Sequence, residues 1–168
     1  MGAKARFPGV LMGIDWGGRR VGVALSDPSR TLARPLTVLV RDGAGTIPFQ
    51  EGEKLLASLQ KIAADHDVTG LVFGVPYYHL SGDPNPHAPL FLRVARDLSR
   101  DLALPLFLHD EGQSSEAARE IRKGHPGRRS SAQSLDHVAA AALLQGFLDA
   151  PPGERREVSE GALLGEDS

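Results

Sequence analysis

Acidic side chains occupy comparable places at three distant points of this sequence. Asp15 directly follows a first apolar run, Asp110 and Glu111 follow another, and Asp136 opens the last apolar stretch. If the strand before Asp15, the apolar run 68–75 and the strand before Glu111 are neighbours in one sheet, Asp15 and Glu111 come together at its edge, and a helix packed across the sheet can bring Asp136 between them. Carboxylates that close repel and raise each other's pKa, and a divalent cation removes that conflict. Oxygen ligands without cysteine favour hard ions, Mg²⁺ or Mn²⁺.

Two such ions about 4 Å apart would activate a water molecule and stabilise the leaving oxygen of a phosphodiester, which is nuclease chemistry. Each acid also has a structural alternative. Asp15, before a glycine, can bond to turn amides, Asp136 can favour the dipole of its helix, and at least one of Asp110 and Glu111 is expected to be structural. For each acid taken alone, the structural role is the stronger interpretation. Only the joint placement of the three acids favours a metal site.

The elements that position these acids follow from apolar periodicity and turn residues. Gly17 and Gly18 join the first two strands as a hairpin. We predict five strands, at residues 9–15, 20–26, 31–40, 68–75 and 104–110. We predict helices at residues 49–65, 90–102, 114–122 and 134–150. Three meandering strands followed by strand–helix units predict an α/β protein with a five-stranded mixed sheet flanked by helices.

Length and composition bound the class of protein. The chain has 168 residues, 41% of them apolar, so we expect one domain over residues 1–152 and a polar, acidic, mobile tail over 153–168. The absence of cysteine excludes disulfides and thiolate metal sites and favours a reducing cytoplasm. The first apolar run stops at Asp15, too short for a signal peptide or a membrane span, so we expect no membrane association.

Charge is unevenly distributed along the chain. The net charge of −2 argues weakly against a nucleic-acid partner, but residues 153–168 alone carry −3. The segment 119–129 gathers five basic residues, which we interpret as a substrate-binding surface rather than a solvated helix end: Arg119, Arg122, Lys123, Arg128 and Arg129.

Three further residues are candidates for substrate contact. Arg19 and Arg20 lie on the hairpin, and strand alternation turns at most one of them towards the acids. Tyr77 follows the fourth strand in a loop, where its ring can stack on a base or pack against a nearby proline.

Four segments resemble, in order and spacing, the YqgF/RuvX family of Holliday-junction-resolvase-like proteins, also regarded as ribosomal RNA processing nucleases: GIDWGGRRVGVALSD, VTGLVFGVP, LPLFLHDEGQSSEAARE and LDHVAAAALLQGFLD. The resemblance implies a ribonuclease H-like fold, and it carries the catalytic, metal-binding carboxylates over to Asp15, Glu111 and Asp136. It also implies metal-dependent hydrolysis of nucleic acid, often described as 5′-end processing of the 16S ribosomal RNA precursor. Gly112 stands where the family usually has arginine, and the loop YYHLSGDPN differs from the family's Asn and Asp-Gly pattern, so both bear on substrate preference.

Other functions compete with this interpretation. A Holliday junction or branched-DNA resolvase needs the same acids, and cleavage of a two-fold junction would require a homodimer. An actin-like ATP-binding phosphotransferase also opens with an Asp-x-Gly hairpin, but this chain has no second glycine-rich phosphate loop. A non-catalytic nucleic-acid-binding module would not need all three acids. RNA is therefore the expected partner by resemblance, with branched or single-stranded DNA as alternatives.

Overall fold

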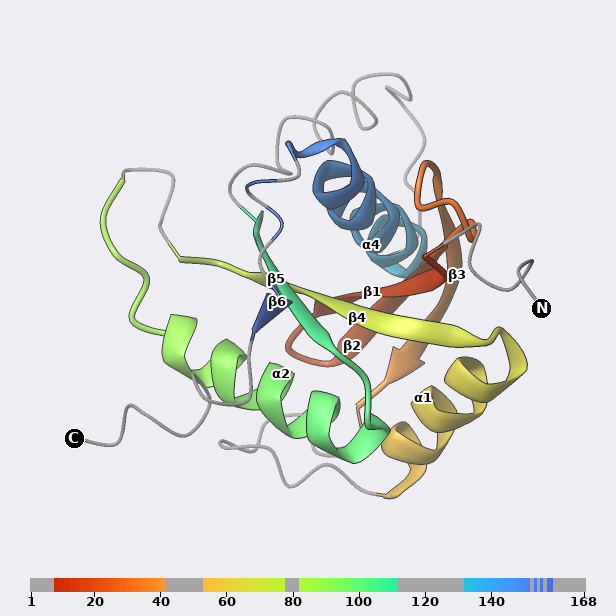
Figure 1. Cartoon of the computed structure of the whole chain (residues 1–168). Coiled ribbons are helices and arrows are strands. Elements are labelled where there is room, and N and C mark those ends of the chain that lie inside the picture. Colours follow the sequence, from red (N-terminus) through yellow and green to blue (C-terminus); the bar gives the residue numbers. More distant parts are fainter. Residues whose placement is uncertain are drawn as a thin grey trace.

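A mixed β-sheet with the strand order β3-β2-β1-β4-β5-β6 organises the chain in the computed structural model (Figure 1). The structure describes residues 8–41, 53–77, 82–111, 132–151, 153, 155, 157 and 158, without the side chains of 53 and 132–137. The strands are β1 (Val10–Trp16), β2 (Arg20–Ser26), β3 (Ala33–Val40), β4 (Val68–Val75), β5 (Leu106–Asp110) and β6 (Glu157–Val158). The helices are α1 (Glu53–Asp65), α2 (Ala88–Leu102) and α4 (Ala132–Asp149).

Parallel pairing in the middle of the sheet brings the carboxyl ends of three strands to one edge. β4 pairs in parallel with β1 on one side and with β5 on the other, whereas β1–β2 and β2–β3 are antiparallel. This confirms that the first, fourth and fifth strands are neighbours. The C-terminal ends of β1, β4 and β5 therefore share one edge, where ligands of such sheets bind.

The sheet has one strand more than the five that were predicted. Glu157 and Val158 pair antiparallel with the start of β5 and add a short edge strand. Two residues in a polar segment carry no usable alternation, so the sequence pattern could not reveal this pairing. The predicted boundary at residue 152 and the mobility of the segment beyond it stay predictions.

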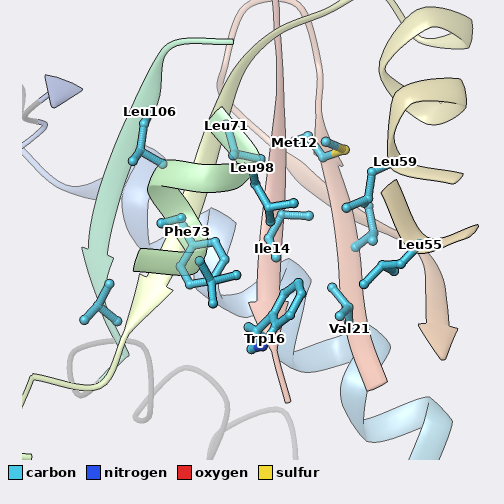
Figure 2. Packing of buried hydrophobic residues seen from close by; sticks show 14 of the residues in the cluster. Met12, Ile14, Trp16, Val21, Leu55, Leu59, Leu71, Phe73, Leu98 and Leu106 are labelled. Atoms are coloured by element: carbon cyan, nitrogen blue, oxygen red, sulfur yellow. The ribbon is translucent and has the colours of Figure 1, made fainter. Parts of the chain in front are cut away.

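Helices cover both faces of the sheet (Figure 1). α1 and α2 lie on one face, and α4 crosses the other. Figure 2 shows the core beneath α1 and α2, the α1/α2-side cluster, which includes Met12, Ile14, Trp16, Val21, Leu55, Leu59, Leu71, Phe73, Leu98 and Leu106. The α4-side cluster consists of Leu11, Ala24, Val72, Ala140, Leu144, Phe147 and Leu148. The two clusters fit the nearly continuous apolar runs of β1 and β4, which are buried on both faces.

Helix α4 corresponds to the last of the four predicted helices. Among the described helices it alone packs on its face of the sheet, over the α4-side cluster. Gln145 of α4 accepts a hydrogen bond from the backbone N–H of Ala33 at 2.9 Å and donates to the carbonyl of Thr31 at 3.0 Å, so it fixes the start of β3. Arg155 donates to the carbonyls of Ala150 and Leu148 and caps the end of α4. The helix predicted at 114–122 lies outside the described residues. None of the described helices has the length and apolar character needed to cross a membrane.

Candidate active site

Asp15 and Glu111 meet on the α4 face of the sheet. On β1, Leu11 belongs to the α4-side cluster and Gly13 packs under Leu144, so strand alternation gives Asp15 the same face. Glu111 directly follows β5, and its side chain lies over Gly74 of β4 on that face. The register Ile14–Phe73 between β1 and β4 continues to Asp15 beside Gly74. Two acids far apart in the chain therefore converge at the carboxyl edge of three strands.

The two carboxyl groups form a hydrogen-bonded pair. The pKa of Glu111 is raised from 4.5 to about 8, first by burial, then by the charge of Asp15, by a hydrogen bond with Asp15, and by the charge of Asp110. Glu111 therefore retains its proton at neutral pH when no cation is bound, and its hydroxyl donates to Asp15. Holding a proton between two acids is how such a pair avoids the repulsion of two full charges.

The donor set of this pair suits a hard divalent cation. The two carboxyl groups supply only oxygen, the ligand type that Mg²⁺ and Mn²⁺ prefer. Position 136 of α4 lies one turn before Ala140, which is buried on the sheet side, and two turns before Leu143, which packs on Gly74. The side chain of Asp136 is outside the described set, and among the side chains that are described no three His, Asp or Glu residues gather as a metal site.

The hairpin that follows Asp15 is fixed by Arg41, the residue directly after β3. Arg41 is only 6% exposed, and its Nη1 donates to the carbonyls of Gly17 and Gly18 at 2.9 Å each. Its guanidinium lies 4.8 Å from the ring centroid of Trp16, which is buried in the α1/α2-side cluster. Arg41 thus backs the turn from the face opposite Asp15. A basic residue at the end of a strand gives no signal of this role in sequence.

The arginines of the hairpin differ in position. Arg19 is exposed in the turn. Arg20 begins β2 and is partly buried, and because Ala24 belongs to the α4-side cluster, alternation gives Arg20 the same face as Asp15. Arg20 therefore stands on the side of the sheet that carries the carboxyl pair.

Tyr77 lies on the other side of the sheet from the carboxyl pair. It is partly buried and packs against the α1/α2-side cluster. Burial, followed by the charge of Asp110, raises the pKa of its phenol. Substrate contact by Tyr77 stays a prediction. Three groups of residues lie outside those that the structure describes: Gly112, residues 78–81 of the loop 77–85, and the basic residues Arg119, Arg122, Lys123, Arg128 and Arg129.

Gly74 is a second residue that the sequence did not single out for the site. It lies in the segment VTGLVFGVP, which carries part of the family resemblance. A Cβ built on Gly74 would lie 2.9 Å from Cγ of Glu111, so the acid occupies space that any side chain would take. The available sequence signal was a glycine near the end of a buried strand, one position before its last residue, which often marks a close approach of another group to the backbone.

Comparison with known proteins shows which family this chain matches. Residues 9–150 match the family described as RuvX, Holliday junction resolvase. The chain is 37% identical over 145 residues to a Roseiflexus protein named “Putative pre-16S rRNA nuclease”, covering 84% of this chain and 95% of that protein. A Cereibacter sphaeroides protein of the same name is 38% identical over 142 residues, covering 84% and 83%.

Solved structures give the same fold. The structure of T. thermophilus RuvC in complex with a Holliday junction substrate aligns with a TM-score of 0.57, at 16% identity, over 89% of this chain and 99% of that one. A second Thermus thermophilus RuvC structure aligns with a TM-score of 0.52 at 15% identity. The ribonuclease H-like architecture expected from the sequence is therefore confirmed.

Proposed function

Because this chain belongs to the RuvX family, we propose that it is a divalent-metal-dependent nuclease that hydrolyses phosphodiester bonds, with RNA as its substrate. The observation that carries this proposal is the hydrogen-bonded pair of Asp15 and Glu111 at the carboxyl edge of the sheet. The names of its relatives favour a ribosomal RNA precursor as the RNA. The cysteine-free sequence supports action in the cytoplasm.

The residues that would hold the metal are Asp15, Glu111 and Asp136, the last from helix α4. When bound, Mg²⁺ or Mn²⁺, as one or two ions, would supply activation of water and stabilisation of the leaving oxygen. The pKa of Glu111, about 8, means that binding of a cation at this pair near neutral pH would require loss of the proton of Glu111. The side chain of Glu111 is partly buried and lies against Gly74 of β4, which would limit the orientations of its carboxyl group.

Substrate binding would rely on cations around this edge. Arg20 lies on the face of the carboxyl pair and Arg19 at the exposed turn beside it, so both can meet backbone phosphates. The basic segment 119–129 follows Glu111 in the chain and would extend the same surface. Phosphate contacts of this kind bind nucleic acid without reading its sequence.

The test is a cleavage panel on precursor-like RNA, single-stranded DNA and a four-way DNA junction with Mg²⁺, Mn²⁺ or EDTA. Asp15→Asn and Glu111→Gln should abolish metal-stimulated cleavage. Asp65→Asn is the matched control, because Asp65 is exposed at the end of α1, shortly before β4 begins, and is bonded only to surface Lys61 in the ion pairs described. Equal cleavage by wild type and Asp15→Asn would exclude the proposed site.

The family description favours one second candidate, resolution of Holliday junctions. Preferential cutting of the four-way junction, by a species that sedimentation shows to be a dimer, would select it over RNA processing. Cleavage of RNA by a monomer would select the first function. ATP turnover without nucleic acid would contradict both.

A further inference from the structure

Two glycines on neighbouring strands face helix α4. A Cβ on Gly13 of β1 would lie 2.9 Å from Cβ of Leu144, and a Cβ on Gly74 of β4 would lie 2.6 Å from Cδ1 of Leu143. Real Cβ atoms do not approach other heavy atoms this closely. Adjacent residues of α4 therefore pack directly on the backbone of two adjacent strands.

Gly74 differs from Gly13 in a second contact. Its Cβ would also lie 2.9 Å from Cγ and 3.1 Å from Oε1 of Glu111, whereas the three nearest atoms to a Cβ on Gly13 all belong to Leu144. The side chains of Glu111 and Leu143 thus both lie directly against the backbone of β4 at Gly74. From there the carboxyl group of Glu111 reaches Asp15, which lies beside Gly74 on the next strand.

Backbone conformation does not explain the glycine at position 74. The positive φ angles among the described glycines belong to Gly9 and Gly82, and Gly74 lies inside a regular strand. Any residue can adopt such an extended conformation. What position 74 needs is the absence of a side chain.

We propose that Gly74 is a positioning residue for the carboxyl pair, because the missing side chain leaves the space in which Glu111 lies against β4 and reaches Asp15. This inference rests on the proposed function and adds a residue to it that touches neither substrate nor metal. Gly74 acts through Glu111, whose side chain lies against the backbone at this position.

The test compares Gly74→Ala with Gly13→Ala. Both changes add one methyl group beneath α4, so both should lower the melting temperature. Only Gly74→Ala should also displace Glu111, and it should reduce the single-turnover cleavage rate and the affinity for Mn²⁺ by about 10- to 100-fold each. Mn²⁺ affinity is measured as the metal-induced rise in melting temperature, which needs no activity. Binding of uncleaved RNA in EDTA should be unchanged in both variants.

A double variant separates displacement of the acid from poor packing. In Gly74→Ala/Leu143→Ala the contact with Leu143 is removed while the contact with Glu111 remains, so stability should recover in part and the Mn²⁺ response should not. Recovery of both would overturn the inference, as would a Gly74→Ala protein that binds Mn²⁺ and cleaves as well as Gly13→Ala. If the wild type cleaves nothing, the proposed function fails, and the Mn²⁺ responses of the two glycine variants still decide the role of Gly74.

Discussion

Replacement of Glu111 by glutamine changes the carboxyl pair in a way that stability measurements can detect. In the metal-free protein at neutral pH, the protonated carboxyl of Glu111 donates a hydrogen bond to Asp15. A glutamine amide N–H can make the same bond without titrating. We therefore expect Glu111→Gln to be more stable than the wild type at neutral pH, although it should be inactive. Loss of function with gain of stability is typical of residues kept for chemistry.

The pH dependence of this effect follows from the raised pKa of Glu111. Its pKa is about 8 in the folded protein and 4.5 ordinarily. The stability that comes from holding the proton is fully present below pH 4.5 and is lost as pH rises through the folded pKa of about 8. With about 1.4 kcal/mol for each pH unit, the loss between pH 4.5 and pH 7 has an upper bound of about 3 kcal/mol. Because Glu111 keeps partial contact with solvent, we expect about 1–3 kcal/mol.

Urea unfolding in EDTA between pH 5 and pH 8 measures this difference. The free energy of unfolding of wild type minus that of Glu111→Gln should fall across this whole range as pH rises, and Asp65→Asn should follow the wild type throughout. Added Mg²⁺ should restore the wild type at pH 7 and leave Glu111→Gln unchanged. Parallel curves for wild type and Glu111→Gln over the whole range would refute the raised pKa, and with it the close pairing of the two acids.

Three other changes test separate parts of the structure. Arg41→Ala should lower the free energy of unfolding by about 2–4 kcal/mol, because two charge-assisted hydrogen bonds and a cation–π contact are lost; a urea midpoint equal to wild type would contradict this. Gln145→Ala should cost about 1–2 kcal/mol in the same assay, since it leaves the N–H of Ala33 without its side-chain acceptor, and an unchanged value would show that water replaces the amide. Charge reversal at Arg128 and Arg129 should weaken RNA binding. It should also reduce the slope of the logarithm of the binding constant against the logarithm of salt concentration by about one for each lost phosphate contact. An unchanged affinity in a salt titration would show that the basic segment is not part of the binding surface.

The sequence predicted the fold well where local pattern and burial coincide. The strands that became β1, β4 and β5 are nearly continuous apolar runs, which indicates central strands, and an acid directly after such a run must lie at the edge of the sheet. Asp15 and Glu111 could therefore be predicted to meet before the pairing was known. The position of residue 136 on α4 followed from helical spacing.

Features that depend on tertiary contacts could not be predicted in this way. The role of Arg41 rests on hydrogen bonds to a turn 23 and 24 residues earlier, which no local pattern encodes. The need for a glycine at position 74 arises only when α4 and Glu111 both pack on that strand. β6 is too short to show alternation, and its pairing depends on the register of β5.

The strand order also determines when the site can exist during folding. β4 lies between β1 and β5 in the sheet but directly follows or precedes neither of them in the chain. β2, β3 and α1 separate it from β1, and α2 separates it from β5. Closing these long loops is slow relative to forming a hairpin. A nascent chain that has formed only its β1–β2–β3 meander already carries Asp15 but has no partner acid for it. Nuclease activity should therefore emerge only after the parallel pairs have formed and synthesis has passed α4, which carries Asp136.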